Sequence, residues 1–201
     1  MKMKFRLIIL LVVLVLSVPV NITDAATGNA GYAVYRDGVI GTGIWHAGLM
    51  NSPTSNDWYP VTHILGDSNG VIKHQWCCFI DNNVFKGVYR PNQAMTSYAR
   101  DLVIATSQKL TEESISYNFL YQINYNLSGD PNWVYPGDII SLRCDGVVEY
   151  CYEWHGFKIY GGTYWDITRK GVKYFEEHAS LSINPNTQAQ NYMTLVQTTK
   201  P

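Results

Sequence analysis

The feature that most constrains the fold is a series of four β-type segments in the first half of the 201-residue chain. Two of them lie within Gly31–Met50 and are separated by the turn signal Asp37-Gly38, and the others are Val61–Leu65 and Val71–Ile80. The segments are rich in β-branched and aromatic residues, and residues typical of turns separate them. Because most of the connections are short enough for hairpins, the series predicts an antiparallel sheet.

Helical spacing follows the sheet segments. Within Asn92–Leu110, apolar residues recur on one expected helical face, at Met95, Tyr98, Leu102, Ala105 and, with looser spacing, Leu110. A run of strands followed by helices is typical of an α+β domain, in which an antiparallel sheet packs against helices.

A second helical segment, RCDGVVEYCYEW at Arg143–Trp154, begins with Cys144. Its helical spacing is carried by Val147, Val148, Cys151 and Trp154. At a helix N-terminus, the backbone N–H groups and the positive end of the helix dipole favour the thiolate, which is the nucleophilic form of cysteine. A buried structural thiol is the alternative reading, since cysteine is among the most buried residue types.

The first 26 residues have the pattern of an export signal. Basic residues precede the apolar run Leu7–Leu16, and a stretch of small residues ends at Ala26. The run is shorter than the roughly 20 residues that span a bilayer, so we expect cleavage and no stable membrane insertion afterwards. The expected organisation is a signal peptide at 1–26, a main domain at 27–182 and a loosely attached tail at 183–201, in a secreted or cell-envelope protein.

The 15 basic and 16 acidic residues nearly balance, which argues against nucleic acid as a partner. In a helix, Cys144 and Cys151 would lie about 10 Å apart, beyond the reach of a disulfide. Cys77 and Cys78 are adjacent and, in a strand, would point to opposite faces. A bridge from one of them to Cys151 stays open, and Cys144 is expected to be free.

Two of the histidines that precede Cys144 in strand segments are candidates for its catalytic partners. A nucleophilic thiol needs a base and a group that orients the base, and these residues need not be close in sequence. His46 lies in Ile44–Met50, and His63 lies in the next segment. Pairing of the two strands would let His63 orient the His46 imidazole beside the thiol. A satisfied core histidine is the alternative for His46.

A zinc site is a further alternative for the histidines. His46, His63 and His74 are spaced by 17 and 11 residues, which matches no compact ligand motif. His155 and His178 lie at a helix end and in a polar segment, where solvated side chains are expected. We therefore expect neither a metal nor a cofactor.

Two motifs resemble those of a known enzyme superfamily. HAGLM at His46–Met50 resembles the His-x-Gly-Ile-Tyr strand of NlpC-type papain-like enzymes, and VTHI at Val61–Ile64 resembles the next strand. RCDGVVEYCYE resembles their nucleophile helix. The histidines precede the cysteine here, as in the circularly permuted branch that includes bacterial amidase-like proteins and lecithin retinol acyltransferase relatives. The resemblance covers roughly Gly31–Trp165.

The resemblance implies a permuted papain-like domain, with an antiparallel sheet or partial barrel packed against helices. It implies Cys144 as nucleophile, His46 as base and His63 as the orienting residue. Tyr117 is the best match to a tyrosine near the oxyanion site of permuted members, where the backbone N–H of Cys144 is a second donor. Asp145 stands where serine is common, and an acid facing the sulfur would raise the pKa of the thiol.

The implied function is a secreted cysteine hydrolase of the peptidase or amidase type, which cleaves a cell-wall peptide or a related small amide. A lipid ester hydrolase or acyltransferase is one alternative. The other is a non-catalytic secreted binding protein on the same scaffold, because a fold does not fix a function.

Overall fold

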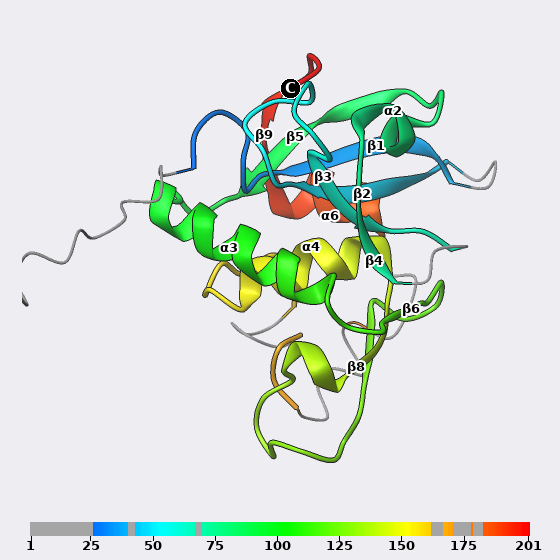
Figure 1. Cartoon of the computed structure of the whole chain (residues 1–201), viewed down its shortest axis with the longest axis vertical. Coiled ribbons are helices and arrows are strands. Elements are labelled where there is room, and N and C mark those ends of the chain that lie inside the picture. Colours follow the sequence, from blue (N-terminus) through cyan, green and yellow to red (C-terminus); the bar gives the residue numbers. More distant parts are fainter. Residues whose placement is uncertain (1–25, 40–42, 67–69, 162–166, 171–177, 179–182) are drawn as a thin grey trace, which may run out of the picture.

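The computed structural model describes residues 26–39, 43–66, 70–161, 167–170, 178 and 183–201. Almost all of the expected signal peptide lies outside these residues. Figure 1 shows an α+β arrangement in which a six-stranded sheet packs against helices, as the sequence predicts. None of the helices in the described part of the chain combines the length and the apolar character of a membrane span.

The large sheet is antiparallel at every pairing of neighbours. Its strands, in order across the sheet, are β4 (Val71–His74), β3 (Val61–Ile64), β2 (Ile44–Met50), β1 (Ala33–Val39), β5 (Phe85–Pro91) and β9 (Met193–Gln197). The predicted strands at β2 and β3 are therefore confirmed. Asp37-Gly38 lies inside β1 instead of forming a turn, at a point where the register with β2 shifts.

Four helices and a small sheet complete the described elements. The helices are α2 (Trp76–Ile80), α3 (Ser97–Leu110), α4 (Cys144–Glu153) and α6 (Pro185–Tyr192). The small sheet has the order β6 (Ser116–Tyr117), β8 (Ile139–Leu142) and β7 (Ile123–Tyr125), and the 3-10 helix η1 (Pro136–Asp138) leads into β8. β8 pairs in parallel with β6 and antiparallel with β7.

The two faces of the large sheet bury different clusters. Ala47 and Leu49 of β2 belong to the main core, together with apolar residues of α3, α4 and α6. Met50 of β2 belongs to a smaller cluster around Phe79 of α2. In Figure 1, α3 and α4 accordingly lie on one side of the sheet and α2 on the other. Alternation of side chains along β2 explains why Ala47 and Leu49 lie on one side of the strand and Met50 on the other.

α4 is the central helix of the domain. All ten of its residues are buried, including Asp145, Glu149 and Glu153. It packs against β2 and β3 of the large sheet and against α3 and α6. The predicted helix is confirmed, and its end is close to the expected one, because Gly156 follows with a positive φ of 80°.

The segment Val71–Ile80 is not one strand. β4 ends at His74, and the short helix α2 follows from Trp76. Phe79 is completely buried in the smaller cluster, with Trp76 and Ile80 packed against that cluster. Burial of the Phe79 side chain, with Trp76 beside it, explains why a single helical turn forms where the apolar run predicts a strand.

The C-terminal segment 183–201 is not a loose tail. Asn184 caps α6 by accepting a hydrogen bond from the backbone N–H of Thr187, and Pro185 occupies the first turn. β9 then pairs with β5 at the edge of the large sheet. Gln188 and Ala189 are fully buried, so the segment is part of the folded domain.

Candidate active site

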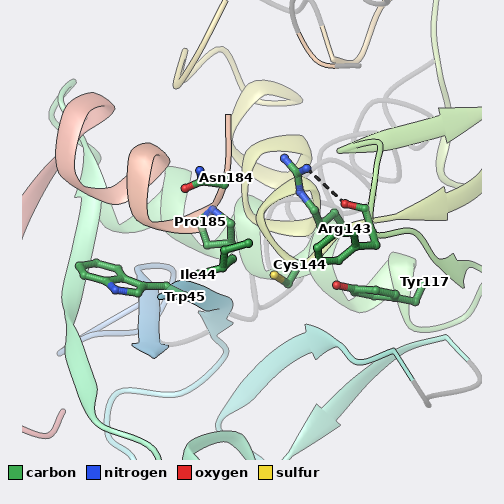
Figure 2. Close-up of a pocket in the computed structure, with 8 residues that line it drawn as sticks. Ile44, Trp45, Tyr117, Arg143, Cys144, Asn184 and Pro185 are labelled. Atoms are coloured by element: carbon green, nitrogen blue, oxygen red, sulfur yellow. Dashed lines mark hydrogen bonds between the residues drawn. The ribbon is translucent and has the colours of Figure 1, made fainter. Parts of the chain in front are cut away.

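Cys144 lies at the start of α4 and lines a pocket (Figure 2). The side chain is 3% exposed, and the pocket in front of it is small and partly open to solvent. The other lining residues are Ile44, Trp45, Tyr117, Phe119, Arg143, Asn184 and Pro185. The lining is predominantly apolar, and it joins β2, β6, the start of α4 and the start of α6.

The approach of α4 to its neighbours fixes the position of the thiol. Arg143 is the N-cap, and its backbone N–H donates to the carbonyl of Gln122 at 3.0 Å. A Cβ atom at Gly146 would lie 1.9 Å from that same carbonyl oxygen. Glycine therefore allows the first turn of α4 to pack directly on the backbone at Gln122.

The surroundings of Cys144 favour the neutral thiol. Burial raises the pKa of the thiol to about 12, and the Asp145 carboxylate adds to the increase. The backbone N–H of Ala47 and the Arg143 guanidinium act in the opposite direction but do not outweigh burial. Near neutral pH, the thiol in this arrangement is protonated and needs a base before it can act as a nucleophile.

Asp145 forms a buried ion pair with Arg143. The Nε and Nη2 atoms of Arg143 donate to the two carboxylate oxygens at 2.6 and 2.8 Å, and both side chains are almost fully buried. The same guanidinium donates to the carbonyl of Ile183 at 2.6 Å, just before α6. The acid after the cysteine thus holds the N-cap residue of α4 in place.

Three histidines form a hydrogen-bonded row. His46 Nε2 lies 2.7 Å from His63 Nδ1, and His63 Nε2 lies 3.0 Å from His74 Nδ1. Burial lowers the pKa of His46 well below its usual range and that of His63 to about 3. Both imidazoles are therefore neutral at physiological pH, and burial makes each a weaker base than a solvent-exposed histidine.

The structure brings His63 to His46 but does not bring His46 to Cys144. The His46 ring packs on Phe79, with ring centroids 5.7 Å apart. A side chain at Gly48, two residues further along β2, would also meet Phe79, at 2.9 Å. Ala47, in contrast, shares the main core with Cys144. The imidazole and the thiol therefore lie on different sides of β2, and no hydrogen bond joins them among the described residues.

The thiol nevertheless lies close to the strand that carries His46. It accepts a hydrogen bond from the backbone N–H of Ala47, the next residue in β2. The expected contact between thiol and imidazole is thus replaced by a contact between the thiol and the backbone. The sequence pattern predicts the correct strand and the correct helix, but it does not determine which side of β2 faces the helix.

Tyr117 is the other predicted site residue that reaches the pocket. It lies beside Cys144 in Figure 2, whereas Tyr135, a tyrosine nearer to Cys144 in the sequence, packs on Trp154 with ring centroids 5.4 Å apart. Burial raises the pKa of Tyr117, with smaller contributions from Cys144 and Asp145. The hydroxyl therefore stays protonated and can donate a hydrogen bond.

The histidine row does not form a metal site. Within the described part of the chain, no group of three or more His, Cys, Asp or Glu side chains is arranged to hold a metal ion. His46, His63 and His74 point their nitrogen atoms at one another along a line instead of converging on one point. This arrangement of the three imidazoles gives no support to the alternative of a zinc site.

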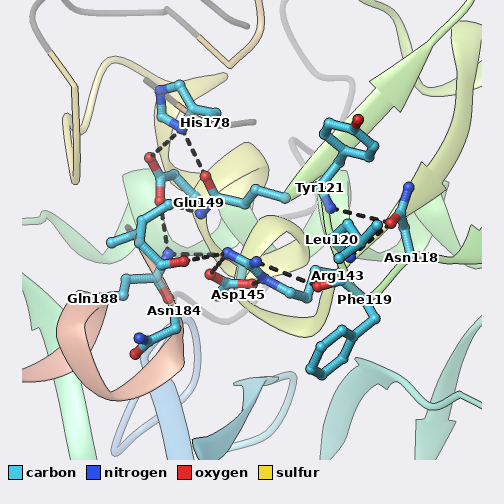
Figure 3. Close-up of polar contacts among 12 residues, drawn as sticks. Asn118, Phe119, Leu120, Tyr121, Arg143, Asp145, Glu149, His178, Asn184 and Gln188 are labelled. Atoms are coloured by element: carbon cyan, nitrogen blue, oxygen red, sulfur yellow. Dashed lines mark hydrogen bonds and ion pairs between the residues drawn. The ribbon is translucent and has the colours of Figure 1, made fainter. Parts of the chain in front are cut away.

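Figure 3 shows a buried polar network behind the pocket, and the sequence does not predict it. Glu149 accepts hydrogen bonds from Gln122 at 2.6 Å and from Gln188 at 2.7 Å. His178 Nδ1 lies 2.6 Å from the amide oxygen of Gln122 and 3.6 Å from Glu149. The expectation of a solvated His178 is wrong, because the side chain is fully buried.

The network connects α4 to α6 behind the pocket. Gln188 of α6 also donates to the carbonyl of Asp145 at 3.0 Å and accepts from the Tyr35 hydroxyl at 2.8 Å. Burial raises the pKa of Glu149, although His178 and the two amide donors act in the opposite direction. A buried glutamine in a polar C-terminal segment carries no periodic signal that sequence reasoning could have used.

All four cysteines are free. Cys144 and Cys151 are buried, whereas Cys77 and Cys78 are exposed on α2. The prediction of a free Cys144 is confirmed, and no bridge joins Cys151 to α2. Comparison of the chain with models of known families, with curated proteins and with solved structures gave no match.

Proposed function

We propose that this protein is a cysteine hydrolase that cleaves an amide bond, with Cys144 as its nucleophile. The observation that carries the proposal is the position of Cys144 at the first residue of a buried helix, facing a pocket with the Tyr117 hydroxyl beside it. The chain order also supports it, because strands with His46 and His63 precede the cysteine helix, as in the circularly permuted NlpC-type papain-like enzymes that the motifs resemble. The domain would be a permuted member of that superfamily.

The proposed reaction begins with proton transfer from the thiol to His46. The thiolate adds to the amide carbonyl, and the imidazolium donates its proton to the leaving amine. Water then hydrolyses the thioester and restores the thiol. The Tyr117 hydroxyl and the backbone N–H of Cys144 are the candidate donors to the oxyanion.

This reaction requires the His46 side chain to leave its contact with Phe79 and turn towards the sulfur. Because the imidazole and the sulfur lie on different sides of β2, this turn requires the backbone of β2 to rearrange at His46 and Ala47, where the thiol contacts the Ala47 backbone. His63 would then orient an imidazole that has moved towards the pocket. The proposal assigns this rearranged state of β2 to the complex with substrate.

The proposed substrates are a cell-wall peptide or a small amide. A lipid ester is the competing substrate class, since the described lining of the pocket is predominantly apolar. Export through the segment 1–26 is part of the proposal. N-terminal sequencing of protein collected outside the cells should find a chain that begins near Ala26.

The test measures turnover of peptidoglycan peptides, small amides and lipid esters by the full chain. A Cys77→Ser/Cys78→Ser background removes the two exposed thiols, and Cys144→Ala is compared with the matched control Cys151→Ala. The proposal predicts that amide cleavage is lost in Cys144→Ala, is reduced about a hundredfold or more in His46→Ala and persists in Cys151→Ala. Equal activity of Cys144→Ala and the background protein would contradict it.

A non-catalytic binding protein is the second candidate. The observation that favours it is the neutral, buried thiol, which has no base within hydrogen-bonding distance among the described side chains. Under this alternative, no substrate class is turned over, while ligands that enter the pocket change the fluorescence of Trp45. Binding that is unchanged in Cys144→Ala, without any turnover, would favour this candidate over the hydrolase.

A further inference from the structure

The short helix α2 presents two adjacent thiols to solvent. Trp76, Phe79 and Ile80 are its apolar side chains and pack at the smaller core cluster. Cys77 and Cys78 are both exposed. A strand, as expected from the sequence, would have sent them to opposite faces, whereas the helical turn leaves both on the outside.

The two sulfur atoms are neighbours. Cys77 Sγ and Cys78 Sγ lie 3.8 Å apart, within contact for a sulfur hydrogen bond. The Cys77 thiol also donates to the side-chain oxygen of Gln75 at 3.7 Å. No other described thiol is exposed, because Cys144 and Cys151 are buried. The pair is therefore the part of the described chain at which a thiol-reactive molecule from solvent arrives first.

We propose that Cys77 and Cys78 form a thiol–disulfide exchange site that small disulfides oxidise reversibly to a vicinal disulfide. One cysteine, as the thiolate, attacks a sulfur atom of the small disulfide, forms a mixed disulfide and releases one small thiol. The neighbouring cysteine then loses its proton and attacks the bound protein sulfur, which releases the second small thiol. The dithiol loses two electrons and two protons, and the small disulfide is reduced to two thiols.

The second cysteine should displace the small thiol faster than the mixed disulfide can persist, because its sulfur atom is already 3.8 Å from the first. The vicinal disulfide closes a ring that contains both cysteines. The product is strained, since consecutive Cα atoms are about 3.8 Å apart and disulfides ordinarily join Cα atoms about 4.4–6.8 Å apart. Strained, exposed disulfides are readily reduced, so the bond is a reversible modification and not a structural staple.

Oxidation of this pair would act on the histidine row through α2. The strained ring cannot form without backbone movement in α2, which is only five residues long. Phe79, one residue after Cys78, packs on His46 and His63 with ring centroids 5.7 and 5.4 Å apart. Thiol–disulfide exchange at this pair does not itself require Cys144 or the proposed hydrolysis.

The test incubates the full chain with glutathione disulfide, quenches the reaction with acid and maps the peptide that contains both cysteines by mass spectrometry. The wild-type peptide should lose two hydrogen atoms and carry no glutathione, and dithiothreitol should restore it. Cys77→Ser and Cys78→Ser should each keep one glutathione on the remaining cysteine. Cys144→Ser should behave as the wild type does, which separates this result from the proposed hydrolysis.

Two outcomes would overturn the proposal. One is lasting glutathione on both Cys77 and Cys78 of the wild type, which would mean that the ring does not close. The other is an unmodified dithiol in protein whose two exposed thiols are still alkylated by iodoacetamide.

Discussion

Replacement of Gly146 by alanine tests how closely α4 approaches the backbone at Gln122. The added Cβ atom would lie 1.9 Å from the carbonyl oxygen of Gln122 and 2.9 Å from its carbonyl carbon. Neither atom belongs to a flexible side chain, so relief requires α4 and the Gln122 backbone to move apart. That movement also strains the hydrogen bond from the Arg143 N–H to the same carbonyl, which is 3.0 Å long.

The magnitude follows from three opposing contributions. Overpacking of a dense core costs about 1–3 kcal/mol, and a weakened hydrogen bond costs about 1 kcal/mol. Alanine in place of glycine within a helix contributes about 1 kcal/mol in the stabilising direction. We expect a net loss of about 2 kcal/mol in the free energy of unfolding. For a chain of this size, that loss lowers the melting temperature by about 4–8 °C.

Thermal unfolding followed by circular dichroism measures this change. Gly137→Ala is the matched control, because its added Cβ would meet only the Glu113 side chain, at 3.8 Å or more. We expect that variant to stay within about 0.5 kcal/mol of the wild type. A melting temperature of Gly146→Ala equal to or above that of the wild type would refute the close contact, since helix propensity alone predicts that result.

Three further predictions concern the buried charges. Asp145→Asn leaves the buried Arg143 without its counter-charge and should destabilise the fold by about 3–5 kcal/mol in urea denaturation. The control Glu112→Gln, in the exposed pair with Lys109, should leave stability nearly unchanged. Similar effects of the two substitutions would argue against a stabilising ion pair between Arg143 and Asp145. Burial lowers the pKa of His63 to about 3, so its contribution to the free energy of unfolding is complete above about pH 6.5 and is lost as pH falls from there towards 3. The His63→Gln variant should therefore lose about 1–2 kcal/mol less stability than the wild type between pH 7 and pH 5. An equal loss in the two proteins would contradict this account. Burial raises the pKa of Glu149, so the contribution of its protonated form to stability is present at low pH and is lost as pH rises through the raised pKa. The free energy of unfolding of Glu149→Gln should therefore change less than that of the wild type between pH 5 and pH 8. An equal change in the two proteins would rule out this role.

The helices and strands that carry periodic apolar residues could be predicted from the sequence. β2, β3 and α4 occur where alternation and helical spacing indicate them. The buried face of α3 differs from the expected one. Leu110 is fully buried as expected, but Tyr98 is 70% exposed and Val103, which the predicted face does not include, is fully buried. The contacts with α4 and the sheet select the face, and a helix with several apolar sides does not determine that choice alone.

The candidate site could be predicted only in part. Cys144 and Tyr117 meet in one pocket, and His46 meets His63, as the motifs suggest. The separation of the two pairs depends on which side of β2 packs against α4. A shift by one residue exchanges the two faces of a strand. Apolar residues both precede and follow His46 in the sequence, so the pattern allows either face of β2 to pack against α4. The helix α6 is not predicted for a different reason. Asn184-Pro185 carries a helix-start signal, but the polar residues that follow show no apolar periodicity that would indicate a buried helix face.

The most direct test of the central claim asks whether Cys144 becomes acylated. The Cys77→Ser/Cys78→Ser protein is incubated with peptidoglycan peptides, small amides and lipid esters, quenched with acid and analysed by peptide mass spectrometry. The account predicts an acyl group on Cys144 that comes from an amide substrate, is much reduced in His46→Ala and is absent from Cys151. A Cys144 that stays unmodified with every substrate class, or an acyl group whose yield does not depend on His46, would contradict it.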